Sequence, residues 1–265
     1  MSADVASPRM GAGSADQLAQ ELCAALASKA HGLIAGARVR AAIEQHVPAD
    51  DPAWQALAAL WNDLPLDEHM ADGGKYRFRR FSALKAKVTN QSAVIEPMPH
   101  RAFFQSTGYN TLNGGGARRF EPLAPAALDN PVLGGLLDLC VNTLRPLADA
   151  SEWEVELHPI RTRALGASEG LATPEGLHQD GVDFFFVVHL QRRNISGGVS
   201  LVFDSERRVI LQHTLEAPFD ILAVHDPRTF HSVTPFVAEP VNHPQAWRDV
   251  IVINFRDCSR PDRRL

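Results

Sequence analysis

The fold is decided by the segment DFFFVVHL at residues 183–190, an apolar run of strand length that is rich in aromatic and β-branched residues. Similar short segments follow it, separated by turn residues such as Gly197, Gly198 and Pro227. No helical pattern interrupts this succession, so a fold of alternating strands and helices is not expected. Many short strands in a row instead predict a β sandwich or barrel. The expected strands after the first are residues 198–203, 208–214, 220–224 and 249–255.

Helical patterns precede this strand-rich half. Leu18, Leu22 and Leu26 recur at the spacing of one helix face. A second helix is predicted to begin at Pro52, which favours the first helical position, and Trp61 belongs to its apolar face. Both helices are expected to cover one side of a core.

Between the helices and the strand-rich half, the pattern is mixed. Residues 76–81 partly alternate aromatic and basic residues, which predicts a half-exposed strand, with an interaction patch as the alternative. One further helix is expected near residues 131–145, packed on the sheet. The predicted organisation is a disordered leader at residues 1–13 and a single domain at residues 14–265, with a helical cover at residues 14–70 and a β core at residues 75–258.

Composition narrows the classes of function. The 265 residues are 45% hydrophobic and 22% charged, which is typical of a globular protein. The net charge of -5 disfavours a nucleic-acid partner. No apolar run approaches the ~18 residues of a membrane span, and the N-terminus lacks the pattern of a signal peptide, so no membrane association is expected. Three cysteines, far apart and odd in number, favour reduced thiols and therefore a cytoplasmic protein.

A candidate metal site lies in the motif His178-Gln179-Asp180. In an extended chain, residues i and i+2 project to the same face, so His178 and Asp180 can hold one ion. His231, just beyond the strand at residues 220–224, is the expected third ligand. Two histidines and one carboxylate on one face of the ion form the facial triad of non-haem Fe(II) oxygenases, which leaves coordination positions open. Zinc is the alternative metal for this ligand set.

A candidate cosubstrate residue begins the last expected strand. Arg248 precedes a run of apolar residues, and its planar guanidinium can bond both oxygens of a carboxylate. The alternative is a surface ion pair between Arg248 and Asp249. Among the other histidines, His189 is expected in the core. His158, which precedes Pro159 at an expected strand end, is a candidate to support the metal site.

Together these segments resemble the bacterial L-isoleucine 4-hydroxylase family, which are Fe(II)/2-oxoglutarate-dependent dioxygenases. The most specific part is FHSVTP at residues 230–235 with WRDVI downstream at residues 247–251. The resemblance covers roughly residues 75–258 and includes LHQD at residues 177–180, LHPIR at residues 157–161 and FFQS at residues 103–106.

This resemblance implies a mainly β fold with flanking helices: a double-stranded β-helix, related to jelly rolls and cupins, with the N-terminal helices packed on one side. It implies that His178, Asp180 and His231 hold Fe(II) and that Arg248 binds the far carboxylate of 2-oxoglutarate. The expected reaction uses O2 and hydroxylates an unactivated C–H bond of a free aliphatic or cyclic L-amino acid, with succinate and CO2 as products.

A free amino acid needs partners for one carboxylate and one ammonium group. Arg118 and Arg161 are candidates for the carboxylate, and Asp183 is a candidate for the ammonium. Gln105 and Tyr109 can add hydrogen bonds from a loop over the pocket.

Three other functions remain open. The same chemistry can act on an intermediate of a natural-product pathway. The fold can also serve as a metal-binding module without turnover. A nucleic-acid demethylase on the same fold is disfavoured by the negative net charge.

Overall fold

The computed structural model describes residues 14–89, 93–148, 150–241 and 243–260. The leader predicted at residues 1–13 lies outside them. A large sheet, here called the major sheet, runs through the molecule. All of its strand pairs are antiparallel. In spatial order its strands are β1 (His31–Ile34), β10 (Ile221–His225), β6 (Phe184–Arg193), β13 (Trp247–Asp257), β5 (Glu152–Arg163), β3 (Ser82–Val88) and β4 (Ala93–Pro97), and β2 (Arg77–Arg79) also pairs with β5.

A smaller sheet, the minor sheet, lies against one face of the major sheet. Its strands are β11 (Phe230–Val233), β8 (Ser200–Phe203) and β9 (Val209–His213), and β12 (Phe236–Ala238) pairs separately with β7 (Ile195–Gly197). A buried cluster joins the two sheets: Phe185 and Leu222 of the major sheet pack with Val202 of β8. Two facing antiparallel sheets are the arrangement expected for a double-stranded β-helix.

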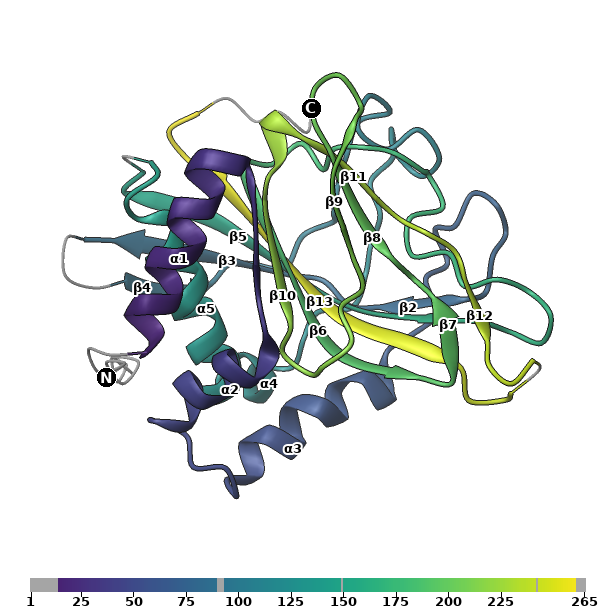
Figure 1. The fold of residues 1–265 in the computed structure, drawn as a ribbon, viewed down its shortest axis with the longest axis horizontal. Helices are drawn as coiled ribbons and strands as arrows, with labels where there is room; N and C mark the ends of the chain where they lie inside the picture. Colours follow the sequence, from purple (N-terminus) through teal and green to yellow (C-terminus); the bar gives the residue numbers. More distant parts are fainter. Residues whose placement is uncertain (1–13, 90–92, 149, 242, 261–265) are drawn as a thin grey trace.

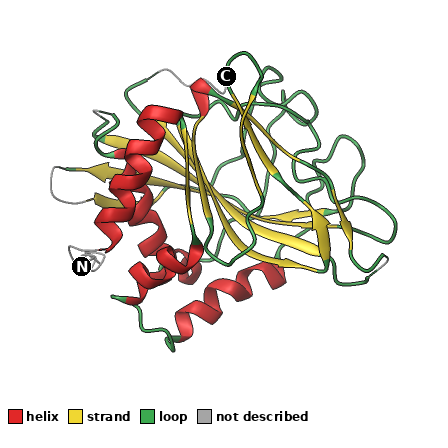
Figure 2. Ribbon diagram, in the orientation of Figure 1, coloured by secondary structure: helices red, strands yellow, loops and turns green. Residues whose placement is uncertain are grey.

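The helices gather on the other face of the major sheet (Figures 1 and 2). They are α1 (Ser14–Lys29), α2 (Gly36–Glu44), α3 (Pro52–Ala59) with the short η1 (Leu60–Asp63), α4 (Pro125–Leu128) and α5 (Pro131–Leu144). The first turn of α3 is capped by Asp51, whose side chain accepts from the Ala53 N–H at 2.8 Å, with Pro52 at the first helical position. The helix predicted from Pro52 is therefore confirmed.

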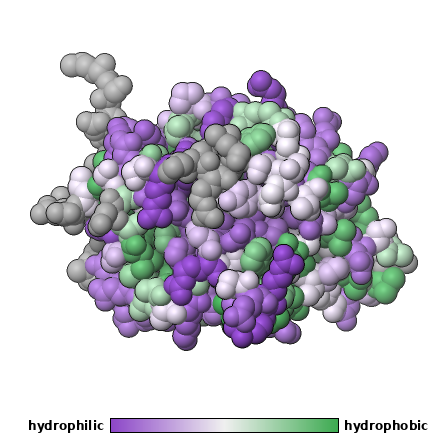
Figure 3. Space-filling model, turned by 90° about the horizontal axis from the view of Figure 1, so that it is seen from above, coloured by the Kyte–Doolittle hydropathy of each residue, from purple (hydrophilic) through white to green (hydrophobic). Residues whose placement is uncertain are grey.

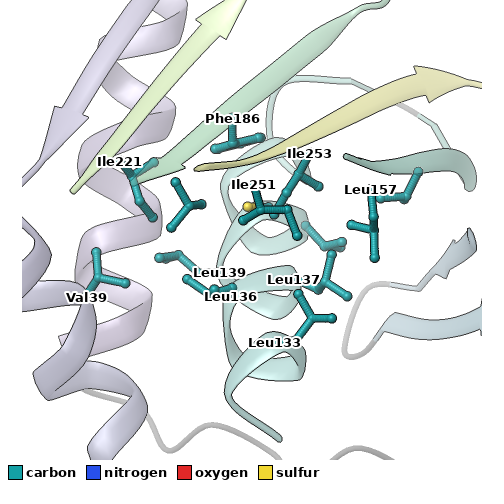
Figure 4. Packing of buried hydrophobic residues seen from close by; sticks show 14 of the residues in the cluster. Val39, Leu133, Leu136, Leu137, Leu139, Leu157, Phe186, Ile221, Ile251 and Ile253 are labelled. Carbon is teal, nitrogen blue, oxygen red and sulfur yellow. The ribbon is translucent and has the colours of Figure 1, made fainter. Parts of the chain in front are cut away.

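The main core lies between α5 and the major sheet (Figure 4). Leu133 and Leu136 of α5 and Phe186 and Ile253 of the sheet have 0% exposure. Full burial of one such side chain stabilises the fold by about 1.5–3 kcal/mol, so this interface fixes the sheet in place. Asn130 caps α5 through hydrogen bonds from the N–H groups of the two residues after Pro131.

Successive side chains of the central strands point to opposite faces of the major sheet. On β5, Trp153, Val155 and Leu157 pack towards the helices, whereas His158 and Ile160 face the space between the sheets. The same alternation holds on β13, where the even-numbered residues from 248 to 254 line that space and the odd-numbered residues from 251 to 255 belong to the helical core.

Two expectations about strands need correction. The strand predicted within residues 76–81 forms as β2, with alternating burial, but its basic residues are on the buried face: Arg77 and Arg79 are 4% and 6% exposed and face the space between the sheets. His158 does not end a strand but lies inside β5. The Pro159 carbonyl accepts from the Arg80 N–H at 3.3 Å, so the proline nitrogen, which lacks a hydrogen, faces the same side, between the part of β5 that pairs with β3 and the part that pairs with β2.

The strands β1, β3 and β4 and the helix α2 were not predicted. β1 is only four residues long and pairs with β10 directly after α1. None of the described helices is long and apolar enough to cross a membrane. The face of the molecule in Figure 3 mixes hydrophilic side chains with small hydrophobic areas.

Candidate metal centre and adjoining pocket

A pocket opens between the major and minor sheets, and the predicted metal ligands lie in its wall. His178 and Asp180 come from the segment before β6, and His231 comes from β11. The distance from His178 Nε2 to Asp180 Oδ1 is 3.7 Å, and from His231 Nε2 to Asp180 Oδ2 it is 3.6 Å. One ligand atom from each residue lies within 4.8 Å of the others, so the three side chains can hold one metal ion.

The backbone brings the two histidines together. His178 and His231 form an isolated antiparallel bridge, in which each N–H donates to the other carbonyl at 3.1 and 2.9 Å. The Nδ1 atom of His178 lies 2.9 Å from the carbonyl oxygen of Gly176. An Nδ1–H that donates to this carbonyl leaves Nε2 with its lone pair directed at the ion, which is the usual arrangement for a metal-bound histidine.

Asp226 holds the segment that carries Asp180. Its two carboxylate oxygens accept from the N–H groups of Asp180, Gly181 and Val182 at 3.0, 2.9 and 3.2 Å. Asp226 begins the short helix η2 (Asp226–Arg228) and is 0% exposed. Gln179 points away from the ion, as expected, and donates to the Asp226 carbonyl at 2.7 Å. The metal ligand Asp180 is therefore fixed by its backbone.

Without a bound ion, the positive charge of the site lies on His178: burial lowers its pKa, but its contacts with Asp180 and Glu175 outweigh burial and raise the pKa to about 9. Burial lowers the pKa of His231 to about 3, so that ring is neutral at physiological pH. Burial raises the pKa of Asp180, but its contact with His178 outweighs that effect and lowers the pKa. Burial and the charge of Asp180 raise the pKa of Asp226 to about 7. A cation between these groups relieves the repulsion between the two carboxylates.

Arg248 lines the same pocket from β13. It is 4% exposed, and its Nε and one terminal nitrogen have no hydrogen-bond partner among the described residues. Burial lowers the pKa of Arg248 to about 10, which still leaves it charged. The alternative ion pair with Asp249 is wrong, because Asp249 pairs with Arg161 at 2.7 Å instead. A buried guanidinium without a partner favours binding of an anion.

Further arginines line the same pocket. Arg118 donates to Gln105 Oε1 at 2.8 Å, and Gln105 Nε2 in turn lies 3.3 Å from Asp180 Oδ1. Arg79 contacts Nδ1 of His158, and burial lowers the pKa of His158 to about 4, so the ring is a neutral acceptor. Three predicted residues, Arg118, Gln105 and His158, thus line the pocket.

Three other predicted substrate residues do not line it. Arg161 lies on the face of β5 opposite His158, because strand residues alternate, and its guanidinium binds Asp249. The carboxylate of Asp183 accepts from the Asp257 N–H at 2.8 Å and from Arg260 at 3.2 Å. Tyr109 packs its ring against Gly181. These positions give the three side chains structural partners.

Sequence reasoning missed Glu175, which lines the pocket beside the metal site. Its Oε1 lies 3.4 Å from His178 Nε2 and 3.3 Å from Asn110 Nδ2. Its position follows from a turn, closed by the Gly176 N–H on the Thr173 carbonyl at 2.9 Å, with Gly176 at φ +79°. The sequence signal was the segment TPEG at residues 173–176, a turn pattern with one acid just before the metal motif.

Comparisons with known proteins agree with this geometry. The family model described as 2OG-Fe dioxygenase matches residues 58–254. The L-isoleucine-4-hydroxylase of Bacillus thuringiensis is 27% identical over 187 residues, which are 69% of this chain and 75% of the relative. A bsmA homolog from Methylobium petroleophilum has a solved structure with a TM-score of 0.79 at 32% identity, covering 91% of this chain and 93% of that one.

A second solved structure, IDO from Bacillus thuringiensis, has a TM-score of 0.71 at 22% identity and covers 90% of this chain and 99% of that one. At this identity the similarity concerns the fold alone. Together with the two facing sheets, these structures confirm the expected mainly β fold with a double-stranded β-helix core.

Proposed function

The chain belongs to the 2OG-Fe dioxygenase family, and from this premise we propose that it hydroxylates an unactivated C–H bond of a free aliphatic or cyclic L-amino acid. Its metal is Fe(II), and its cosubstrates are 2-oxoglutarate and O2. The proposal is carried by the convergence of His178, Asp180 and His231 in one pocket with Arg248, two of whose side-chain nitrogens have no partner in the described part of the chain. The similarity to an L-isoleucine-4-hydroxylase supports an amino acid as substrate.

In this proposal each residue has a defined task. His178, Asp180 and His231 hold the iron on one side, and Asp226 keeps Asp180 in place through the backbone. Arg248 binds the far carboxylate of 2-oxoglutarate. Bound Fe(II), with 2-oxoglutarate and O2, supplies the oxidising chemistry that converts a C–H bond to C–OH and releases succinate and CO2.

The protein itself contributes placement and exclusion of water. The pocket wall between the polar groups is apolar and includes Phe103, Ile160 and Val252. An aliphatic substrate side chain fits such a wall, because its burial is favourable and no polar group of the wall loses hydration. The substrate carbon must be held close to the iron, since a displacement of ~1 Å can cost ~100-fold in rate.

The test is a panel of free L-amino acids, supplied with Fe(II), 2-oxoglutarate and O2. We expect one or more aliphatic or cyclic amino acids to gain the mass of one oxygen atom while an equal amount of succinate forms. The variant His231→Ala should form neither product. Absence of oxygenated product and of substrate-dependent succinate across the panel would remove free amino acids as substrates, and activity only on carrier-bound intermediates would favour a biosynthetic role.

A further inference from the structure

The pocket contains buried charged groups of both signs in which single atoms have no hydrogen-bond partner among the described residues. The side chain of Glu175 is 8% exposed, and its Oε2 has no hydrogen-bond partner within the described part of the chain. The Nε atoms of Arg79 and Arg118 are also buried without an acceptor there. Building on the proposed function, we propose that Glu175 binds the α-ammonium group of the substrate and that Arg79 and Arg118 bind its α-carboxylate.

The need of Glu175 for a cation follows from the metal site. In the structure its nearest cationic group is His178, with 3.4 Å between Oε1 and Nε2. When His178 binds a metal through Nε2, that atom carries no proton and cannot donate to Glu175. The amide of Asn110, at 3.3 Å, is then its remaining donor. Burial of a charged carboxylate that has one neutral hydrogen-bond donor costs free energy. An ammonium group offsets this cost, because it brings a positive charge and three N–H donors.

Glu175 is not a fourth ligand in this arrangement. Among the described residues, the group whose ligand atoms all lie within 4.8 Å of one another consists of His178, Asp180 and His231. Glu175 lies beside this group, on a turn that Thr173 ties to β11, since Thr173 Oγ1 accepts from the Val233 N–H at 2.9 Å. It is therefore placed next to the iron without taking a coordination position.

Arg77, Arg79 and Arg118 differ in the group that each one contacts, and therefore in whether a carboxylate compensates its charge. Arg77 forms an ion pair with Asp67 at 2.7 Å, and both side chains are at most 5% exposed, so the charge of Arg77 is already compensated although one of its terminal nitrogens has no partner among the described residues. Arg79 contacts the neutral His158, and Arg118 contacts the neutral amide of Gln105. Among the described residues, therefore, no carboxylate in direct contact compensates their charges, which favours an anion between them.

Aromatic rings orient these two cations. The guanidinium carbon of Arg79 lies 4.2 Å from the ring centre of Phe120, and that of Arg118 lies 4.8 Å from the ring centre of Phe103. Stacking holds the planar groups but leaves their edges for hydrogen bonds. A carboxylate that meets both edges is fixed in orientation, and the ammonium of the same α-carbon then points to Glu175.

This arrangement of charges selects for one class of substrate. An α-amino acid with a free amino group satisfies both ends of this arrangement. An N-acylated amino acid carries no charge for Glu175, and an α-hydroxy acid replaces the ammonium with a neutral hydroxyl group. Both analogues leave the Glu175 carboxylate buried and unpaired.

The test is a thermodynamic cycle on the protein loaded with Mn(II) and 2-oxoglutarate without O2, so that only binding is measured. Isothermal titration gives the Kd of L-isoleucine, of N-acetyl-L-isoleucine and of the matching α-hydroxy acid, for the wild type, Glu175→Gln and the exposed control Glu206→Gln. In the wild type we expect L-isoleucine to bind about 10- to 100-fold more tightly than either analogue, the effect of one charge-assisted hydrogen bond. In Glu175→Gln this preference should shrink to near unity, and Glu206→Gln should keep it.

A purely structural role for Glu175 gives a different result, because it weakens the amino acid and the hydroxy acid equally, and this outcome overturns the proposal. Hydroxylation of an amino acid by Glu175→Gln with unchanged KM also overturns it while the proposed function stands. Glu175-dependent binding of L-isoleucine without oxidation of any amino acid supports the binding site and refutes the proposed function. Absence of binding and of oxidation by the wild type overturns both.

Discussion

Replacement of Asp226 by asparagine tests how the metal site is held. The side chain of Asp226 contacts the backbone of the expected iron ligand Asp180: its two oxygens accept from three N–H groups, those of residues 180–182. An amide has one oxygen. If this oxygen keeps the two bonds to Gly181 and Val182, the NH2 group faces the Asp180 N–H, and two donors meet at the distance of a hydrogen bond.

The expected loss of metal affinity follows from this contact between two hydrogen-bond donors. A buried N–H group without an acceptor costs about 1–3 kcal/mol. In the metal-free protein, this loss is offset because the variant also removes the repulsion between two carboxylates that raises the pKa of Asp226 to about 7. A bound cation already relieves the repulsion, so the loss appears in metal affinity. We therefore expect Asp226→Asn to bind Mn(II) about 10- to 100-fold more weakly.

The assay is competition for Mn(II) with a fluorescent chelator at pH 8, with circular dichroism as a check of the fold. Asp204→Asn is the matched control, because Asp204 accepts from the backbone N–H groups of Glu206 and Arg208 at 2.9 Å in a turn of the minor sheet, away from the metal ligands. The control should keep the wild-type Kd. A folded Asp226→Asn protein with wild-type Mn(II) affinity would refute the positioning role.

Three further changes have defined outcomes. Arg248→Met should raise the KM for 2-oxoglutarate by about 100-fold or more, as expected for removal of one partner of a buried charge pair, and leave the Kd of Mn(II) within about twofold; an unchanged KM contradicts the assignment. Leu136→Ala removes a side chain with 0% exposure and should lower the free energy of unfolding in urea by about 3–5 kcal/mol. Burial raises the pKa of Asp138 from 3.8 to about 6, so its charge disfavours the folded state progressively between about pH 4 and pH 6. Asp138→Asn should therefore stabilise the protein by roughly 1–3 kcal/mol at pH 8, and a gain that persists undiminished near pH 4 would contradict this cause.

The sequence was sufficient to predict those strands, helices and ligands for which the local residue pattern agrees with the tertiary structure. The apolar strand β6 and the helix α5 followed from periodicity, because each buries one continuous apolar surface. The pair His178 and Asp180 followed from the two-residue repeat of an extended chain. The approach of His231 required the assumption that distant segments meet, and the backbone bridge between His178 and His231 provides that contact.

The polar end of the pocket was harder to predict, because charged residues are ordinarily expected at the surface. Arg79 was not singled out within the half-exposed strand predicted at residues 76–81, and the structure buries it with His158 and Phe120. Glu175 lies in a turn and belongs to no periodic pattern. Arg161 was wrongly predicted as a substrate residue, although a rule available from the sequence argues against it: it lies at an odd offset from His158 on the same strand and so belongs to the other face.

The alternation of residues along β5 and β13 has a consequence for protein engineering. His158, Ile160 and Thr162 on β5, with Val250 and Val252 on β13, border the pocket, while Leu157, Ile251 and Ile253 between or beside them belong to the helical core. A mutant library confined to the bordering positions changes the catalytic cavity but spares the contacts that hold the helices. Such a library should contain a high proportion of folded variants, and selection for a new substrate can then act on recognition without a concurrent search for stability.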